Sequence, residues 1–196
     1  MAEIKSTMDL VMERMAKMTA KATPVTSDEE HQKTGMRLAA EYLNNQLPDL
    51  VKELAGQPPE AQQASHKGAV QTLLRNVVLP RDETLRERSE AALNGVMTIA
   101  AALKVSAISQ TCKELQQLLQ QYGQHKEQVL QQLEGALKGQ LEQQYGGRGV
   151  DPGKIRASMH PKYHEEVARM QQELNGQYTT AMDQRKEMIQ QQLGLI

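Results

Sequence analysis

The chain has 196 residues with no Phe, no Trp and five Tyr, so its core must be built from aliphatic side chains and Met, which favours packed helices over an enclosed ligand cavity. It carries 23 basic and 24 acidic residues, with a formal net charge of -1, and this gives no bulk attraction to nucleic acid or to an anionic membrane. The single cysteine, Cys112, excludes an internal disulfide, as is typical of a cytoplasmic protein.

No segment has the character of a membrane span or an export signal. The most apolar run, residues 96–109, contains Lys104 and is shorter than the roughly 20 residues that cross a bilayer. The first residues alternate charged and apolar side chains, unlike a secretory signal. We therefore expect no membrane insertion and a cytoplasmic location.

A Met-rich helix is predicted over about residues 3–20, followed by a linker that completes the segment 1–26. Its apolar residues recur every three or four positions and share one face: Ile4, Met8, Val11, Met12, Met15 and Met18. Because unbranched methionines make this face adaptable, we interpret it as a docking surface, with plain core packing as the alternative.

A compact helical domain is predicted over residues 27–108. Ser27 and Glu30 have the spacing of a capping box, in which both side chains bind free amides at a helix N-terminus. Pro48, Gly56 and Pro80 divide the following residues into short helices. These helices are expected to pack together through short connections.

A long antiparallel helical hairpin, resembling a coiled coil, is predicted over residues 109–196. Two stretches rich in Leu, Gln, Glu and Lys each carry one apolar stripe, and a glycine-rich turn near residues 146–160 separates them. The predicted fold class is thus all-α. Since two helices cover only one side of each other, we also expect a homodimer. The stripe residues expected to mediate interactions are Leu119, Leu133, Leu137, Val167 and Leu174.

Two histidines form the arrangement that most suggests a metal site. His160 and His164 are four residues apart, which places two imidazoles on one helical face. Pro161 lies between them, however, and no Cys is near. We interpret the pair as a solvated helix start, with a metal-ligand pair as the alternative, and we predict no cofactor.

Basic residues concentrate at the predicted hairpin turn. Arg148, Lys154, Arg156 and Lys162 are opposed only by Asp151. Such a tip can contact an acidic partner, a phosphate or nucleic acid, but four basic residues without stacking aromatics make a poor nucleic-acid footprint. We therefore interpret the tip as a soluble turn and do not expect nucleic-acid binding.

The first of the two long helical stretches also contains two closely spaced glycines and the single cysteine. Gly135 and Gly139 have the GxxxG spacing that permits close approach of a second helix, and the charges around them exclude a bilayer, so we expect either a tight helix crossing or glycines that the helix merely tolerates. Cys112 has no local Cys/His signature, so a buried, inert thiol is predicted.

Several segments resemble those of a bacterial family of uncharacterised helical proteins. They are the opening MAEIKS, the segment GMRLAAEYL, the junction NVVLPRDE and the Gln-rich C-terminal helices. The resemblance implies a bacterial, cytoplasmic, all-helical protein and implies no activity.

The sequence shows no assembled catalytic site, so we predict a non-enzymatic scaffold, adaptor or assembly protein that acts through helix–helix interactions with unknown protein partners. The first alternative is a stalk-like structural subunit of a larger complex, suggested by the length of the last two helices. The second is a nucleic-acid- or metal-binding regulator that uses the basic tip or the histidine pair.

Overall fold

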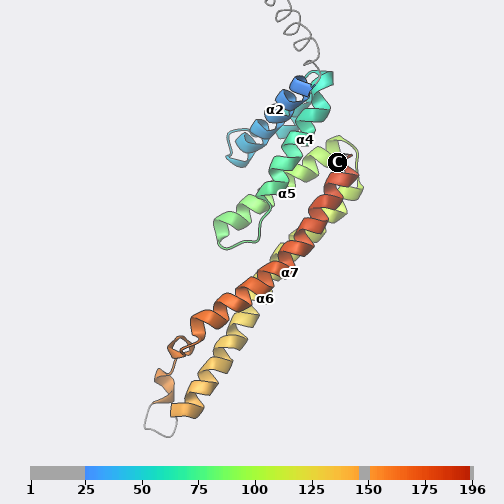
Figure 1. Cartoon of the computed structure of the whole chain (residues 1–196). Coiled ribbons are helices and arrows are strands. Elements are labelled where there is room, and N and C mark those ends of the chain that lie inside the picture. The colour runs from blue at the N-terminus through green and yellow to red at the C-terminus, as the bar shows by residue number, and fades with distance from the viewer. Residues whose placement is uncertain (1–24, 146–150, 195–196) are drawn as a thin grey trace, which may run out of the picture. The chain divides into compact units, whose positions relative to one another are not determined.

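The described part of the chain is all-helical. The computed structural model describes residues 25–145 and 151–194, and within them it contains helices and short 3-10 turns but no strand (Figure 1). The all-α prediction is therefore confirmed. In chain order the elements are α2 (Val25–Leu43), α3 (Leu50–Ala55), α4 (Pro59–Asn76), α5 (Glu83–Ala102), α6 (Ala107–Tyr145), η1 (Pro152–Lys154), η2 (Ala157–Met159) and α7 (Tyr163–Gln192).

The chain divides into two compact units, Met1–Arg75 and Asn76–Ile196. The first holds α2, α3 and nearly all of α4, and the second holds α5, α6, α7 and the two 3-10 turns. This division differs from the predicted domains, because α5 packs on α6 and so shares a unit with the long helices. The domain limits 1–26, 27–108 and 109–196 stay a prediction.

Two glycines bring α2 and α4 into close contact in the first unit. A Cβ atom added to Gly35 would lie 1.8 Å from the carbonyl oxygen of Ser65, and one added to Gly68 would lie 2.0 Å from the carbonyl oxygen of Gln32. The Ser65 side chain is fully buried, and its hydroxyl donates to the carbonyl oxygen of His31 at 3.1 Å. The two backbones meet here only because neither glycine has a side chain.

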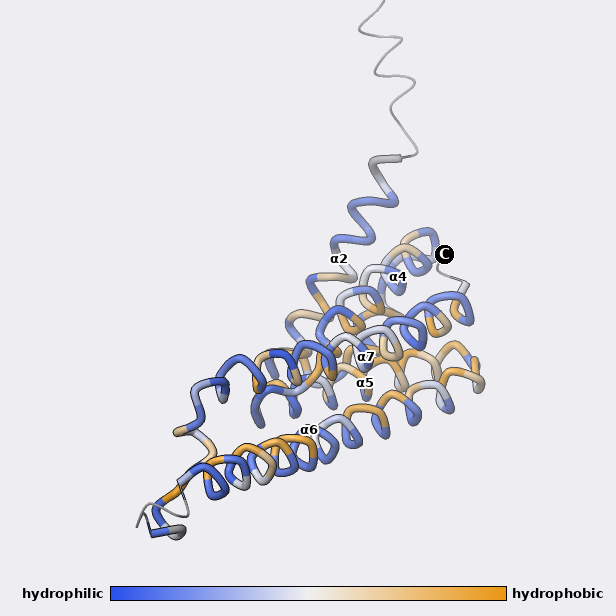
Figure 2. Tube along the Cα trace, turned by 60° about the horizontal axis from the view of Figure 1, so that its bottom comes forward, coloured by the Kyte–Doolittle hydropathy of each residue, from blue (hydrophilic) through white to orange (hydrophobic). Residues whose placement is uncertain are grey.

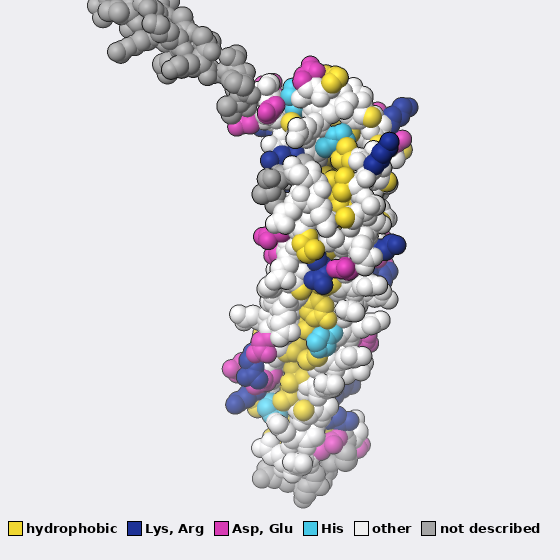
Figure 3. Space-filling model, turned by 90° about the vertical axis from the view of Figure 1, so that its right-hand side faces the viewer, with side chains coloured by type: hydrophobic (Ala, Val, Ile, Leu, Met, Phe, Trp, Pro, Cys, Tyr) yellow, Lys and Arg dark blue, Asp and Glu magenta, His cyan; other side chains and the backbone are white. Residues whose placement is uncertain are grey.

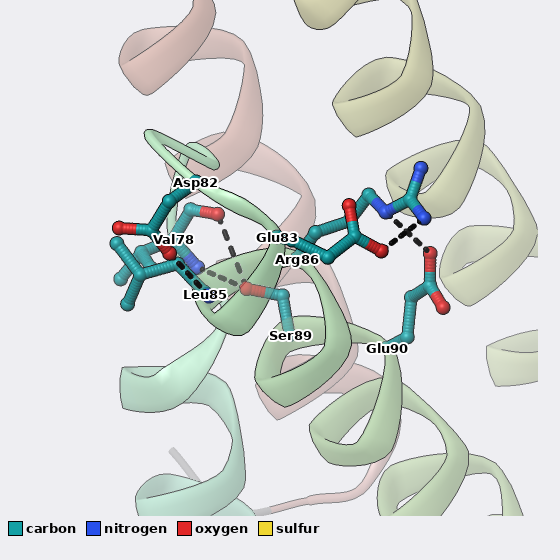
Figure 4. Close-up of polar contacts among 7 residues, drawn as sticks. All are labelled: Val78, Asp82, Glu83, Leu85, Arg86, Ser89 and Glu90. Atoms are coloured by element: carbon teal, nitrogen blue, oxygen red, sulfur yellow. Dashed lines mark hydrogen bonds and ion pairs between the residues drawn. The ribbon is translucent and has the colours of Figure 1, made fainter.

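The second unit begins with a loop that a buried serine ties to α5. The Ser89 hydroxyl accepts a hydrogen bond from the backbone N–H of Val78 at 3.1 Å and lies 3.2 Å from the carbonyl oxygens of Val78 and Asn76 (Figure 4). The Asp82 carboxylate caps α5 by accepting from the N–H of Leu85 at 2.9 Å. Both contacts satisfy backbone groups that a loop would otherwise leave unpaired.

α6 and α7 pack against each other along their lengths. Apolar and polar residues alternate along α6 in the hydropathy colouring of Figure 2, as expected of a helix with a single apolar stripe. Leu115, Leu119 and Tyr122 on α6, and Leu174 and Met182 on α7, are buried. Among the described helices, none combines the length and the apolar character that a membrane span requires.

Candidate functional site

A groove with an apolar floor lies between α6 and α7, in the part of the pair that α5 does not accompany. It has a volume of about 330 Å³. We call it the distal groove, and it is lined by Val129, Gln132 and Leu133 of α6 and by Glu166, Arg169, Met170 and Glu173 of α7. In the lower half of Figure 3, hydrophobic side chains form a lengthwise band between polar ones.

Helix lengths explain why the apolar floor is only half covered. α5 has 20 residues and is joined to α6 by residues 103–106, so it can accompany only the first part of the 39 residues of α6. Leu115 and Leu119, which lie in that part, are buried. Beyond it burial varies along the stripe: Val129, Leu133 and Met170 are only half-buried, whereas Leu137 is buried.

Polar contacts across the seam fix how α6 and α7 are aligned. Glu114 pairs with Arg185 at 3.5 Å, the hydroxyl of Tyr122 donates to the side-chain oxygen of Asn175 at 2.7 Å, and the carboxylate of Glu134 accepts from the hydroxyl of Tyr163 at 2.8 Å. In these three contacts residue numbers rise on α6 as they fall on α7. The hydrogen bond to Glu134 raises the pKa of the Tyr163 hydroxyl, with a smaller contribution from burial.

An aromatic cluster lies at the middle of the seam. The Tyr122 and Tyr178 rings meet edge to face with centroids 5.3 Å apart, and the His125 ring lies 6.0 Å from Tyr178. Burial raises the pKa of the Tyr122 hydroxyl, and the positive charge of Arg81 opposes that shift. The Tyr122 hydroxyl already donates its proton in a hydrogen bond to Asn175. We therefore interpret the cluster as part of the packing between the helices and not as an acid–base pair.

The rim of the distal groove is acidic. Its charged lining residues are Glu166, Glu173 and Arg169, two acidic residues against one basic residue. Glu166 pairs with Arg169 on the same helix, whereas the exposed Glu173 makes no ion pair with any described residue. A binding segment with positive charges beside its apolar face would therefore complement this rim.

The predicted stripe residues lie along this same seam, covered to different degrees. Leu119, Leu137 and Leu174 are buried, whereas Leu133 and Val167 are half-buried. The predicted docking methionines, Met8, Met12, Met15 and Met18, lie outside the described residues, as does Arg148 of the basic tip.

The histidines and the basic residues of the tip lie on the surface. His164 is exposed, and the Nδ1 atom of His160 accepts a hydrogen bond from the backbone N–H of Lys162 at 3.2 Å. Within residues 25–145 and 151–194, no group of three or more His, Cys, Asp or Glu side chains is placed to hold a metal ion. Lys154, Arg156 and Lys162 of the basic tip are exposed.

Buried apolar residues alternate with exposed basic residues in the basic tip. Ile155 and Ala157 are buried, and η2 packs on both α6 and α7. Lys154 and Arg156, which alternate with them, therefore point to solvent. Both basic side chains therefore lie on the surface and do not line an enclosed binding site.

The thiol of Cys112 is unsuited to nucleophilic chemistry. Its side chain is fully buried, and burial raises its pKa to about 11. The thiolate, which is the reactive form, is therefore scarce at neutral pH.

A second groove, with a larger volume of about 600 Å³, lies between α5 and α6. Its α6 wall carries the amides of Gln116, Gln120 and Gln124, one helical turn apart, and its α5 wall carries Arg86 and Glu90, which form an ion pair (Figure 4). This lining offers hydrogen bonds but contains neither a nucleophile nor a histidine. Pro80 and Leu119 also line this groove, so it combines amides and paired charges with apolar side chains.

Three structural features were not predicted from the sequence. They are the close crossing at Gly35 and Gly68, the loop contacts of Ser89 and the polar links across the seam. Glycines inside an otherwise helical pattern were the available signal for the first. The glycines predicted to permit close approach, Gly135 and Gly139, have no atom within 4 Å of an added Cβ.

Comparison with known protein families gives a match to this chain. The model of a family of unknown function (DUF6657) matches residues 51–191, a span that contains the whole α6–α7 seam and the distal groove. No curated protein and no solved structure matches the chain. The match confirms the resemblance to an uncharacterised family.

Proposed function

We propose a function for this chain, which belongs to the DUF6657 family of unknown function, from the geometry of its long helices. It is a non-enzymatic scaffold or adaptor whose α6–α7 pair binds a helix of a partner protein in the distal groove. The observation that carries the proposal is the half-covered apolar floor formed by Val129, Leu133 and Met170.

The energetic basis is the burial of this floor. Full burial of a side chain of this size contributes about 1.5–3 kcal/mol, and since Val129, Leu133 and Met170 already have most of their surface covered, completing their burial contributes roughly 1 kcal/mol. An amphipathic helix lying in the groove would add its own apolar side chains to that gain. Docking of a helix is therefore favourable without any chemistry at the site.

The arrangement of α6 and α7 in this proposal is an antiparallel hairpin that packs like a coiled coil. Support comes from the apolar residues spaced three and four apart on both helices and from the inverse order of the cross-seam contacts. A hairpin of this kind gains most by pairing with one or two further helices, which a second copy could supply. The proposal therefore includes self-association as a homodimer.

The length of α6 favours a stalk-like subunit as the second candidate function. Its 39 residues correspond to about 58 Å of helix at 1.5 Å per residue. A stalk would copurify with its partners at fixed stoichiometry, whereas an adaptor would be released in part on dilution. Native mass spectrometry of the tagged chain from its own cells distinguishes the two.

A matched pair of charge insertions tests the proposal. Met170→Glu places a carboxylate on the floor of the groove, and Gln172→Glu places the same group at an exposed position of the same helix. We expect Met170→Glu to reduce the copurifying partners and the sedimenting dimer at least about tenfold, because burying an unpaired charge costs more than 1.4 kcal/mol. Equal loss in both variants, or loss in neither, would contradict the proposed site.

A further inference from the structure

A pocket of about 460 Å³ lies within the second unit, where the loop before α5 meets α6 and α7. We call it the loop pocket. Four apolar and four polar side chains line it, namely Val78, Leu79, Leu85 and Met182, and Arg81, Tyr122, Asn175 and Thr179. Small-molecule sites have this size, and their lining is likewise apolar with a few polar groups. The loop pocket shares no lining residue with the distal groove.

Three of the polar side chains offer hydrogen-bond donors that no described residue uses. The side-chain oxygen of Asn175 accepts from the Tyr122 hydroxyl at 2.7 Å, which leaves the amide NH2 group of Asn175 without an acceptor. The Thr179 hydroxyl, one turn further along α7, and the guanidinium of Arg81 also have no partner among the described residues. All three residues are exposed, so a ligand can reach them. A group that only accepts hydrogen bonds, such as a carboxylate, matches this set of donors.

The charge of the loop pocket is positive. Arg81 is the charged residue in its lining. The neighbouring carboxylates are engaged elsewhere, because Asp82 caps α5 (Figure 4) and Asp183 of α7 pairs with Lys186 at 3.7 Å. Burial raises the pKa of the Tyr122 hydroxyl, and the charge of Arg81 lowers it, so the guanidinium acts on the polar side of the pocket. An anionic ligand is therefore favoured over a neutral one.

We propose that the loop pocket binds a small carboxylic acid with an apolar body. The carboxylate accepts hydrogen bonds from Arg81 and Thr179, and the hydrocarbon covers Val78, Leu79 and Leu85. Charge-assisted hydrogen bonds hold one end of the ligand, and burial of apolar surface holds the other. The inference goes beyond the proposed function, since it gives the second unit a small-molecule site apart from the groove for a partner helix.

Octanoate tests the proposal on the full-length protein. Octanamide is its matched control, because the two compounds share the hydrocarbon chain and only octanoate carries a charge. Isothermal titration calorimetry should show one octanoate site per chain and binding of octanamide that is weaker by about tenfold or more. Shorter carboxylates should lose roughly twofold in affinity for each methylene removed, since the pocket buries only part of the hydrocarbon.

Two pairs of variants locate the bound carboxylate. Arg81→Gln removes the charge of the pocket, and Arg156→Gln removes the same charge at an exposed position outside its lining. Thr179→Val removes the hydroxyl of the pocket, and Thr180→Val removes that of the next residue, which donates to the carbonyl oxygen of Gly176 at 3.0 Å. We expect Arg81→Gln to weaken octanoate binding about tenfold or more and Thr179→Val about threefold. Both control variants should bind octanoate like the unmodified protein.

The tyrosine rings report the place of binding without any substitution. The chain has no Phe and no Trp, so its aromatic NMR signals come from five Tyr and five His. Octanoate should shift the ring signals of Tyr122 and of Tyr178, whose ring meets that of Tyr122 edge to face. The ring of Tyr163, which contacts Glu134 elsewhere on the seam, should keep its signals.

Four results would overturn the inference. They are no binding of octanoate at millimolar concentration, equal binding of octanoate and octanamide, equal loss in Arg81→Gln and Arg156→Gln, and a shift of the Tyr163 signals without one of Tyr122. If Arg81→Gln lowers the melting temperature of the free protein, the comparison with octanamide and the ring signals of the unmodified protein decide. The proposed function is tested separately by the Met170→Glu copurification, because Met170 lies in the distal groove.

Discussion

Gly35→Ala should destabilise the first unit by about 2 kcal/mol. The added methyl would lie 1.8 Å from the carbonyl oxygen of Ser65 and 2.8 Å from its Cα. Both atoms belong to the backbone, so no rotamer change relieves the clash and α2 must move away from α4. Overpacking of this kind costs about 1–3 kcal/mol or more, and the better helix propensity of alanine returns up to about 1 kcal/mol.

The assay must report on the first unit alone. Hydrogen exchange followed by mass spectrometry, read on peptides from α2 and α4, gives the local free energy of opening. A loss of about 2 kcal/mol raises the exchange rate of protected amides roughly 30-fold. For a unit of this size the same loss lowers the midpoint of thermal unfolding by roughly 10 °C.

Gly139→Ala is the matched control. It makes the same substitution inside a helix, but nothing lies within 4 Å of the added methyl, so it should stabilise α6 by up to about 1 kcal/mol. The reasoning is wrong if Gly35→Ala leaves exchange in α2 and α4 unchanged, or if the two alanine variants shift stability in the same direction.

Three further outcomes are expected. Ser89→Ala should cost about 1–3 kcal/mol in urea unfolding, because it leaves the N–H of Val78 without its acceptor. Alkylation of Cys112 in the folded protein should be slow at pH 8 and rise about tenfold per pH unit towards its pKa of about 11; fast labelling at pH 7 would show that the thiol is accessible and ionised. Glu134→Gln should lower the pKa of Tyr163 towards its ordinary value in an NMR titration, since the carboxylate is the main cause of the raised pKa, and an unchanged pKa would contradict that assignment.

The ends of helices were predictable where the sequence signal for them was local. Pro80 ends the apolar run that continues past the end of α4 at Asn76, and Asp82 caps α5, so the sequence places a helix start near residue 82 and the structure begins α5 at Glu83. The capping box at Ser27 and Glu30 was less informative, because α2 extends back to Val25 and both residues lie within it. A cap motif is a local pattern, whereas the true helix end also depends on what the preceding turn contacts.

The candidate site was predictable as a stripe but not as a groove. Leu119 and Leu133 have the same place in the Leu/Gln/Glu pattern, and the sequence assigns both to a seam. In the structure Leu119 is 7 % exposed, while Leu133 is half-buried. α5 packs on α6 but is too short to cover all of it, and beyond its reach burial differs from one stripe residue to the next, since Leu137 is 5 % exposed; no residue near Leu133 encodes this difference.

The sequence by itself determined that this protein is helical and that its last two helices each carry one apolar stripe, because helix propensity and a three-to-four residue period are properties of neighbouring residues. Only the tertiary structure decided which glycines serve close packing. Gly35 and Gly68 meet backbone carbonyl groups of another helix, whereas Gly135 and Gly139 meet nothing within 4 Å. Close approach depends on the position of a second helix far away in the sequence, and a glycine carries no side chain that could indicate which kind of contact it makes.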